Sequence, residues 1–436
     1  MPKYRITTLG CKVNQAESDA IANELESCGW LPAGDKEPTE LFIVNTCTVT
    51  QKASMQSRQA VRQAIRAHSN ARIVVTGCYA QTEPETIRKI KGIHYIIGNT
   101  DKHRIGRVIA ADQGKANGQT VTVCNDIRKI QPLKPIFTGV AGSRSRPFLK
   151  IQDGCNSFCS YCIVPYARGP SRSLAAENVL QAITTLANAG YREIVLSGVH
   201  LGHYGRDLNP AISLSGLLRR IERLSVSVRV RLSSIEPLEL NDNLIACLTD
   251  SSRFCDHFHI PLQSGDDLIL EKMGRPYRAV AFSNLVTKIR CRITDAAIGV
   301  DTLIGFPGET HQAFVQTYEL MRELPITYLH VFPFSARPGT PAARYPDKVA
   351  PDMLKKRCAQ LRELGKTKRL NFYKEFIGKR LEVLVESTRH SPSGLLRGLS
   401  SNYIPVLIDA GDDHKNQLRS VRVEKRVGNA LVGYLI

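Results

Sequence analysis

The sequence predicts an α/β protein in three parts: an N-terminal doubly wound α/β domain, a central partial (β/α)6 barrel and a small C-terminal β-barrel. Three observations predict this class. Short apolar runs alternate with amphipathic helical patterns over most of the 436 residues. A stretch rich in Gly, Ser and Arg at residues 139–147 interrupts the alternation, as a linker would. Beyond residue 380, short strand-like runs follow one another without a convincing helical pattern.

The first hundred residues contain three apolar runs with a helical pattern between each pair. In chain order these segments are YRITTLG, AESDAIANELESCG, LFIVNT, SMQSRQAVRQAIRAH and RIVVTG. The order predicts a βαβαβ unit with a parallel sheet, because strands that alternate with helices pair in parallel. Polar sequence of low periodicity follows, so we place a domain boundary in the linker and assign residues 1–138 to the N-terminal domain.

The central part, residues 139–374, repeats the alternation of strand and helix six times. Its apolar runs are FLKIQ, EIVLSG, RVRLSS, HFHIPLQ, IGVDTLIGF and YLHVFPF, with amphipathic patterns such as AENVLQAITTLANAG between them. Six units amount to three quarters of the eight-stranded closed barrel, so we expect a barrel that is open on one side. By the same logic, we expect active-site residues at the carboxyl ends of its strands.

The C-terminal part, residues 375–436, is predicted to be a small β-barrel. A basic helical pattern at residues 351–380 leads into it. Its short apolar runs are RLEVLVE, GLLRGL, YIPVLI, RSVRVEKRV and ALVGYLI. Their turn-like spacing is typical of a compact domain built from short strands alone.

The composition limits the classes of function. Apolar residues make up 42% and charged residues 23%, which fits a folded globular chain and excludes a disordered or collagen-like one. Lys and Arg number 59 against 40 Asp and Glu, and the resulting charge of +19 favours nucleic acid as a partner over a membrane surface. No apolar run of membrane-spanning length and no secretory signal occur, so we expect a cytoplasmic protein. Dinucleotide-binding, Walker A and G-x-S-x-G motifs are absent, which removes the commonest alternative enzymes.

Three of the 12 cysteines carry the strongest local signal. Cys155, Cys159 and Cys162 form a C-x3-C-x2-C pattern directly after the first strand of the predicted barrel. A tight loop cannot point three side chains into a hydrophobic core, and no fourth ligand stands at a zinc-site spacing, so both of these interpretations are disfavoured. Three cysteines on a cubane iron-sulfur cluster leave one iron open, and that position can hold a substrate.

The N-terminal domain carries a second set of three, Cys11, Cys47 and Cys78. Each follows one of the apolar runs, and parallel strands of a doubly wound sheet end along one edge. We therefore expect the three sulfur atoms to converge on a second iron-sulfur site, with three buried structural cysteines as the alternative. The other cysteines show no such arrangement and are interpreted as small apolar residues: Cys28, Cys124, Cys247, Cys255, Cys291 and Cys358.

The pattern C-x3-C-x-aromatic-C after the first barrel strand, with Tyr161 at the aromatic position, resembles the radical S-adenosylmethionine superfamily. The resemblance implies that the open iron binds the amino and carboxylate groups of S-adenosylmethionine, which one electron cleaves to a 5'-deoxyadenosyl radical. LSGVHLG, with Gly198, resembles the strand that accepts the methionine amino group. RLSSIEP, with Ser234 and Glu236, resembles the strand at the ribose, and IGFPGE, with Gly305, the strand against the adenine. For each single residue, barrel packing is the alternative.

Two sets of three cysteines, one on an α/β domain and one in a radical barrel followed by a small β-barrel, resemble the methylthiotransferases over nearly the whole chain. LGCKVNQ and NTCTVT, with Lys12 and Val13 after the first cysteine, resemble the branch that acts on N6-threonylcarbamoyladenosine at position 37 of tRNA. The resemblance implies two 4Fe-4S clusters and S-adenosylmethionine as cofactors. It also implies methylthiolation of carbon 2 of the base, with two molecules of S-adenosylmethionine per turnover as methyl donor and radical source.

In that family the N-terminal cluster supplies the methylthio group and the barrel cluster cleaves the cofactor. The implied partners are the anticodon loop of tRNA and an electron donor such as a flavodoxin-type reductant, without a membrane. No side chain is assigned a catalytic role. Three alternatives remain: methylthiolation of isopentenyladenosine in tRNA, methylthiolation of a ribosomal protein, and an RNA-binding iron-sulfur protein that is no enzyme.

Basic residues in the N-terminal domain suggest where RNA binds. Arg58, Arg62 and Arg66 recur at a spacing of four and fall on one face of a predicted helix without an acidic residue. We interpret them as an RNA-binding stripe, with a solvated helix face as the alternative. The C-terminal barrel resembles the TRAM-like RNA-binding domain of tRNA-modifying enzymes, and its candidate contacts are Arg397, Tyr403, Arg419 and Arg422.

Overall fold

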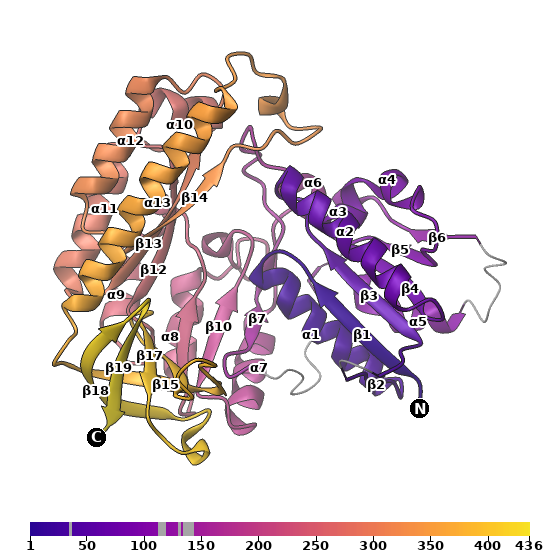
Figure 1. Cartoon of the computed structure of the whole chain (residues 1–436), viewed down its shortest axis with the longest axis horizontal. Coiled ribbons are helices and arrows are strands. Elements are labelled where there is room, and N and C mark those ends of the chain that lie inside the picture. The colour runs from indigo at the N-terminus through magenta and orange to yellow at the C-terminus, as the bar shows by residue number, and fades with distance from the viewer. Residues whose placement is uncertain (35–36, 112–118, 130–131, 134–143) are drawn as a thin grey trace. The chain divides into compact units, whose positions relative to one another are not determined.

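The computed structural model describes residues 1–34, 37–111, 119–129, 132–133 and 144–436 (Figure 1). The chain divides into two compact units. Unit 1 consists of Met1–Gly142, Lys150–Leu174 and Ser335–Ala343, and unit 2 consists of Ser143–Leu149, Ala175–Phe334 and Arg344–Ile436. Residues 139–143 of the expected linker lie outside the described residues. The division into three domains at residues 138 and 374 stays a prediction.

Unit 1 is built on a six-stranded sheet in which every neighbouring pair is parallel. Its strands are β1 (Lys3–Thr8), β2 (Leu31–Pro32), β3 (Leu41–Thr46), β4 (Arg72–Gly77), β5 (Tyr95–Ile97) and β6 (Val121–Val123). They lie in the order β2-β1-β3-β4-β5-β6. The chain therefore starts in the middle of the sheet, adds a strand on one side and then builds outward on the other, which is the doubly wound order of flavodoxin-like sheets.

Helices cover both faces of this sheet because successive side chains of each strand point to opposite faces. Phe42 and Val44 of β3 pack in one apolar cluster with α2 (Gln51–Ala67), α3 (Cys78–Thr82) and α4 (Pro84–Arg88). Leu41 and Ile43 of the same strand pack in a second cluster with α1 (Lys12–Ser27) and α5 (Ile105–Ala111). The predicted doubly wound α/β domain is confirmed.

Six strands, which belong to unit 2 apart from Lys150 at the end of β7, form two three-stranded sheets. They begin within two residues of the six predicted apolar runs. The first sheet has the order β11-β10-β7, from β7 (Phe148–Lys150), β10 (Glu193–Ser197) and β11 (Arg229–Leu232). The second has the order β12-β13-β14, from β12 (His257–Gln263), β13 (Ala297–Ile304) and β14 (Tyr328–Pro333), all parallel. A parallel bridge from Val230 of β11 to Phe254 continues toward the second sheet. This arrangement confirms the partial (β/α)6 barrel.

A helix follows each of these strands in sequence. The helices are α7 (Ala176–Asn188), α8 (Leu214–Glu222), α9 (Asp242–Thr249), α10 (Asp267–Met273), α11 (Ala279–Arg292), α12 (His311–Glu323) and α13 (Pro351–Lys374). Four of them begin where a side-chain oxygen accepts the free N–H of the first turn, at Ser213, Asn241, Asp266 and Thr310. No helix in the described ranges is long and apolar enough to cross a membrane.

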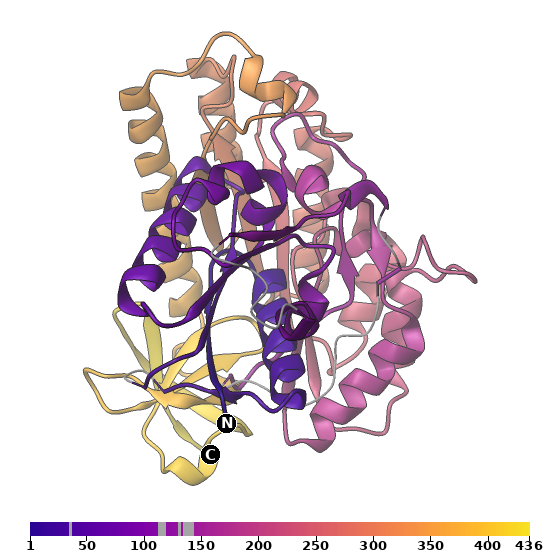
Figure 2. The ribbon, with the colours of Figure 1, turned by 90° about the vertical axis from the view of Figure 1, so that its right-hand side faces the viewer.

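The predicted small C-terminal β-barrel is also confirmed (Figure 2, yellow). It closes in the order β15-β16-β17-β19-β18, from β15 (Arg380–Arg389), β16 (Leu396–Ser400), β17 (Pro405–Ile408), β18 (Leu418–Val427) and β19 (Ala430–Leu435). Side chains such as Val383, Val406 and Val421 fill its interior without exposed surface. Alternation of these apolar residues with polar ones is what a half-buried strand requires.

A buried ion pair holds the β-barrel against the first sheet of unit 2. Glu193 of β10 has no exposed side-chain surface and accepts hydrogen bonds from Arg229 and Arg231 of β11 at 2.6 and 2.8 Å. The two guanidinium groups also donate to the main chain of the barrel, at the carbonyl oxygens of Leu399 and Ser400. Although burial alone would raise it, the pKa of Glu193 is lowered to about 2 by the two arginines.

Candidate functional site

The three N-terminal cysteines follow the carboxyl ends of three adjacent strands. Cys11 stands at the start of α1 after β1, Cys47 comes directly after β3, and Cys78 comes directly after β4 and opens α3. The strands are parallel neighbours, so their carboxyl ends share one edge of the sheet. The strand order reverses between β1 and β3, and in doubly wound sheets this position forms the ligand crevice.

Glycines allow the loops that carry these cysteines to pack closely. Gly10 has φ of +99°, and a Cβ atom on it would lie 2.8 Å from the sulfur of Cys47. Gly77 has φ of +98°, and its Cβ would lie 2.4 Å from the carbonyl oxygen of Thr46. Because both the backbone angle and the space exclude a side chain, these two positions require glycine.

The thiols of this set interact through their charges. The pKa of Cys47 is raised to about 11, mostly by burial and in part by the nearby Cys78 and Cys11, since three thiolates would repel one another. Cys47 and Cys78 are buried, whereas Cys11 is exposed. The side-chain amide of Asn99 donates a long hydrogen bond of 3.7 Å to the sulfur of Cys78. A cation among the three sulfurs would remove the repulsion, so the donor set fits an iron-sulfur cluster.

The second set of cysteines lies in a loop of unit 1 that is closed at its base. Cys155 follows β8 (Gln152–Asp153), and Cys162 precedes α6 (Val164–Arg168). The N–H of Cys155 donates to the carbonyl of Gly169 at 3.0 Å, and the N–H of Cys162 donates to Cys159 at 2.9 Å. The N–H of Ser157 points at the sulfur of Cys155 from 3.4 Å. Such N–H···S contacts are typical of thiolate ligands of iron-sulfur clusters.

Three further features shape this loop. Gly154, with φ of +75°, passes so close to the carbonyl oxygen of Pro170 that a Cβ would lie 2.0 Å away. Phe158 has φ of +43°, is 56% exposed and meets the ring of Tyr166 edge-on at 5.7 Å. Tyr161, the aromatic residue of the motif, is half-buried beside Cys162 in the sequence.

A buried network of charges connects the two cysteine loops within unit 1. Arg168, which ends α6, donates to both carboxylate oxygens of Glu17 at 3.1 Å and to Asp153 at 2.8 Å. It also donates to the side-chain oxygen of Asn14 at 2.6 Å. Glu17 and Arg168 each expose only 2% of the side chain. Although burial alone would raise it, the pKa of Glu17 is held well below its ordinary value by Arg168 and two lysines.

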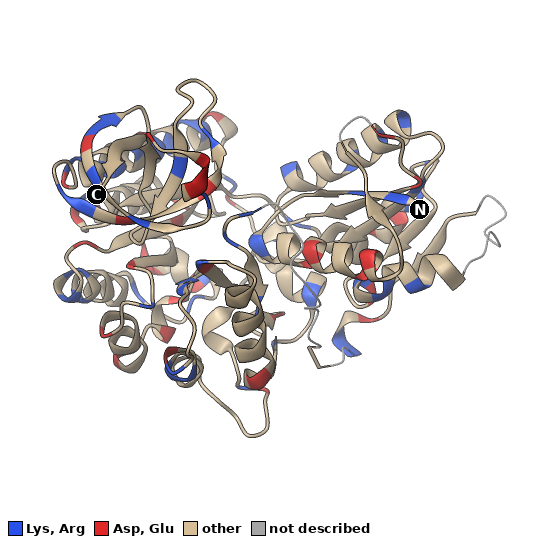
Figure 3. Ribbon diagram, turned by 90° about the horizontal axis from the view of Figure 1, so that it is seen from below, with Lys and Arg blue, Asp and Glu red and all other residues tan. Residues whose placement is uncertain are grey.

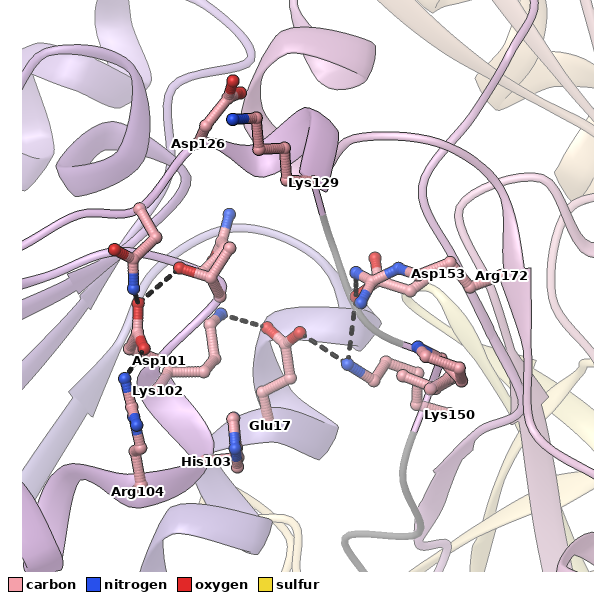
Figure 4. Close-up of a pocket in the computed structure, with 15 residues that line it drawn as sticks. Glu17, Asp101, Lys102, His103, Arg104, Asp126, Lys129, Lys150, Asp153 and Arg172 are labelled. Atoms are coloured by element: carbon pink, nitrogen blue, oxygen red, sulfur yellow. Dashed lines mark hydrogen bonds and ion pairs between the residues drawn. The ribbon is translucent and has the colours of Figure 1, made fainter.

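Figure 4 shows the two lysines, Lys102 and Lys150, on either side of Glu17. They border a cavity of about 630 Å³ near the ends of β5 and β6. The cavity is lined by polar and charged side chains throughout, apart from Pro132 and Leu133. Because Lys102 and Lys150 are each paired with a carboxylate, the charges of the lining are close to balanced.

The motifs did not point to this network, although one signal could have revealed it. Glu17 lies four residues after Val13 and four before Ile21, so it occupies the buried stripe of α1. A charged residue at such a position must be paired to be stable, which predicts a buried partner.

The residues expected to contact S-adenosylmethionine lie after strands of unit 2, with Tyr161 in unit 1. Gly198 directly follows β10, and Ser234 and Glu236 follow β11, its parallel neighbour. Gly305 directly follows β13, with φ of +77° and a Cβ position only 2.5 Å from Leu354. Its N–H donates to Glu309 at 3.0 Å.

These residues differ in their surroundings. Ser234 is exposed, Gly198 is half-buried and Gly305 is buried. Glu236 accepts a hydrogen bond from Arg275, and burial raises the pKa of Glu236 despite that positive charge. Glu236 therefore has one established partner before any ligand binds.

The arginines of α2 are not equivalent. Arg58 is half-buried and donates to the hydroxyl of Tyr79 at 2.7 Å, so it ties α2 to α3. Arg62 and Arg66 are exposed. In unit 2, Figure 3 shows Lys and Arg along the barrel strands beside the C-terminus. Tyr403 of that barrel has its ring stacked on His257 at 4.3 Å, which covers one of its faces.

Comparison with known proteins gives the family. Residues 3–98 match the model of uncharacterized protein family UPF0004, and residues 149–321 match the radical SAM superfamily. The threonylcarbamoyladenosine tRNA methylthiotransferase MtaB of Bacillus subtilis is 36% identical over 96% of this chain and 93% of its own. The protein of that name from Thermotoga maritima is 36% identical over 97% and 96%.

Two further matches extend the comparison. A tRNA-2-methylthio-N(6)-dimethylallyladenosine synthase of Pelotomaculum thermopropionicum is 34% identical over 91% of this chain and 90% of its own. The radical S-adenosylmethionine methyltransferase TsrM of Kitasatospora setae matches 78% of this chain and 77% of its own with a TM-score of 0.57, and at 17% identity this likeness shows the fold alone. The two cysteine sets, the barrel and the relatives together place this chain among the radical S-adenosylmethionine methylthiotransferases, in the threonylcarbamoyladenosine tRNA branch.

Proposed function

We propose that this enzyme methylthiolates carbon 2 of N6-threonylcarbamoyladenosine at position 37 of tRNA, giving 2-methylthio-N6-threonylcarbamoyladenosine. The observation that carries the proposal is the pair of three-cysteine sets in unit 1, each on loops shaped by required glycines. The relatives from B. subtilis and T. maritima, which are named for this nucleoside, support the choice of substrate.

The donor sets fit two 4Fe-4S clusters, one on each set, with one iron of each left without a protein ligand. When bound, the clusters and two molecules of S-adenosylmethionine per turnover supply the methylthio group, the methyl donor and the radical source. Radical chemistry suits the target, because no side-chain base removes a proton from an aromatic C–H bond at neutral pH.

The residues of this chain bind and orient the clusters and S-adenosylmethionine. The buried ion pairs around Arg168 hold the Cys155–Cys162 loop in a fixed place relative to α1, which begins at Cys11. Gly198, Ser234, Glu236, Gly305 and Tyr161 are assigned to S-adenosylmethionine. None of these tasks requires a proton-transfer residue, and we assign none.

The remaining assignments concern partners. Arg62 and Arg66 are assigned to contact the anticodon loop of tRNA. Arg58 holds their helix in place through its hydrogen bond to Tyr79. An external one-electron donor such as a flavodoxin-type protein completes the system. An enzyme that modifies tRNA in this way is assigned to the cytoplasm.

The direct test is mass spectrometry of nucleosides from tRNA of a host that lacks the methylthio mark, with and without this gene. We expect 2-methylthio-N6-threonylcarbamoyladenosine to appear. Methylthiolated isopentenyladenosine alone would support the second candidate function, which the P. thermopropionicum relative favours. No new nucleoside in iron-replete anaerobic cells would point to a protein substrate.

Single substitutions test the two cysteine sets. Cys11→Ala and Cys159→Ala should each abolish methylthiolation and lower the iron content of the holoenzyme. Cys28→Ala is the matched control, because Cys28 is exposed at the end of the same helix as Cys11 and belongs to neither set. If Cys11→Ala retained full activity, the role of the N-terminal set would be wrong.

A further inference from the structure

Polar side chains gather on the inner face of the second sheet of unit 2. Asp301 of β13 pairs in register with His330 of β14, and His259 of β12 pairs with Gly299, two residues before Asp301. The three side chains therefore share one face. On the opposite face, Leu329 packs against Gly365 of α13, where a Cβ would lie 2.9 Å from it. Figure 1 shows α11, α12 and α13 on that outer side.

A chain of hydrogen bonds runs along this inner face. His257 and His259 contact the hydroxyl of Tyr328 at 2.8 and 3.1 Å, and Nε2 of His259 lies 2.7 Å from Oδ1 of Asp301. Although burial alone would raise it, the pKa of Asp301 is held well below its ordinary value by His259 and His330. Since the carboxylate is ionised, Nε2 of His259 must be the donor, which fixes the orientation of Asp301.

The chain of hydrogen bonds ends at two partly exposed side chains, Asp301 and His330. Nδ1 of His330 lies 3.3 Å from Oδ1 of Asp301, and the side chains are 49% and 20% exposed. Oδ2 of Asp301 and Nε2 of His330 make no hydrogen bond to any residue that the structure describes. A carboxylate acceptor and an imidazole nitrogen are thus presented side by side, while the hydroxyl of Tyr328 and both ring nitrogens of His259 behind them have partners.

Asp301 and His330 lie away from the carboxyl ends of their strands. Asp301 stands four residues before Gly305, which corresponds to ~13 Å of strand. Gly305 marks the carboxyl end of β13, where the adenine of S-adenosylmethionine is expected. A ligand group at Asp301 would therefore lie deeper in the barrel than the expected adenine.

We propose that Asp301 and His330 bind the N6 substituent of the modified adenosine and select one that carries hydroxyl and carboxylate groups. This proposal rests on the proposed function above. A hydroxyl or N–H of the substituent donates to Oδ2 of Asp301. Its carboxylate accepts from Nε2 of His330 when the imidazole carries a proton on both nitrogens, since Nδ1 faces Oδ1 of Asp301. The threonylcarbamoyl group offers both kinds of group.

The same pair discriminates against an isopentenyl substituent. That group has neither a hydrogen-bond donor nor an acceptor. It would therefore cover an ionised carboxylate without replacing the hydrogen bonds of the water it displaces. A site built to hydrogen-bond its substrate rejects an apolar analogue far more strongly than an apolar pocket rejects a polar one. The pair therefore acts by attraction and by exclusion.

The experiment compares two anticodon stem-loops of one sequence, one with threonylcarbamoyladenosine and one with isopentenyladenosine at position 37. The reconstituted holoenzyme and its His330→Leu and Asp301→Asn variants are assayed for methylthiolation with one stem-loop at a time. For each variant we expect kcat/KM on the first substrate to fall about tenfold to a hundredfold, mostly through KM, because hydrogen bonds to charged groups are lost. On the second substrate kcat/KM should stay or rise.

His311→Leu is the matched control, because His311 is exposed on α12 outside this sheet, and it should leave the ratio of the two substrates unchanged. Cleavage of S-adenosylmethionine without RNA should be equal in all variants, which shows that they are folded. An unchanged ratio in His330→Leu, with the wild type still active on threonylcarbamoyladenosine, overturns this inference and leaves the proposed function standing. A wild type active only on isopentenyladenosine overturns both.

Discussion

Gly10 decides how closely the loops of Cys11 and Cys47 approach each other. Gly10→Ala would place a Cβ 2.8 Å from the sulfur of Cys47 at a φ of +99°, which disfavours any L-residue. We expect the variant to fold but to lose the N-terminal cluster, so that the reconstituted protein holds about half the iron of the wild type. Iron and sulfide analysis after anaerobic reconstitution measures this.

Gly29 provides the control for Gly10. It has φ of +84°, but nothing lies within 4 Å of its Cβ position, so Gly29→Ala brings the same backbone strain without the clash. We expect full iron content in Gly29→Ala. Equal iron in both variants would show that close packing at Cys47 is not required for the cluster.

Arg168 neutralises two buried carboxylates, Glu17 and Asp153. Arg168→Leu would remove the guanidinium that both carboxylates share, and removing one partner of a buried ion pair costs about 3–5 kcal/mol. We expect the free energy of unfolding in urea to fall by that order. Arg128→Leu, which breaks an exposed pair with Asp126, should leave it unchanged. If both variants unfolded alike, the network would have no structural role.

At the scale of single residues, the sequence could place the cysteines because strand ends obey a topological rule. It could not place Arg168, because its partner Asn14 lies 154 positions away and no short motif joins them. Likewise, equal spacing suggested three equivalent arginines on α2, whereas the contact with Tyr79 sets Arg58 apart. Long-range side-chain pairing decides both cases.

At the scale of elements, the long apolar runs predicted the strands well because β3, β4 and β13 are almost wholly buried and flanked by glycine or polar residues. The sheet order was harder. β2 has only two residues, Leu31 and Pro32, both exposed, so it carries no apolar pattern. Yet this short strand on the far side of β1 makes the sheet doubly wound.

The contact between β10, β11 and the C-terminal barrel should depend on pH. The pKa of Glu193 is lowered to about 2, so its ionised form stabilises the fold above the unfolded value near 4.3, and this contribution is lost as the pH falls toward 2. We expect the difference in unfolding free energy between wild type and Glu193→Gln to narrow below pH 4 by about 1.4 kcal/mol per pH unit.

Urea titrations of the two proteins at pH 5, 4 and 3.5 measure that difference. Glu177→Gln is the control, since Glu177 pairs with Arg220 at the surface and should show a flat difference over the same range. A flat difference for Glu193→Gln as well would mean that Arg229 and Arg231 do not depend on its charge.

At the scale of the whole molecule, the charge of +19 is not explained by internal pairing. The buried arginines and lysines of both units face carboxylates, as at Glu17 and Glu193, so the excess positive charge resides mainly on the surface. Surface charge of one sign attracts a polyanion over distances near the Debye length. The fold thus keeps its interior balanced and leaves a net field for RNA.

This excess should appear as a steep salt dependence of tRNA binding. Each contact with a phosphate releases counterions from the RNA. We therefore expect the Kd for tRNA to rise about tenfold or more between 50 and 200 mM KCl. The KM for S-adenosylmethionine should change little over that range. Arg62→Glu combined with Arg66→Glu should flatten the slope of log Kd against log salt by about 1–2, because each basic side chain at a phosphate adds about one to it.

Arg107→Glu serves as the control for this slope, because Arg107 is exposed on α5, across the sheet from α2. It should lower the net charge without changing the slope. If Arg107→Glu flattened the slope as much per charge as the α2 substitutions, RNA would respond to the total charge of the molecule. A slope altered only by Arg62 and Arg66 would instead mean that phosphates contact that helix, since counterion release counts local contacts.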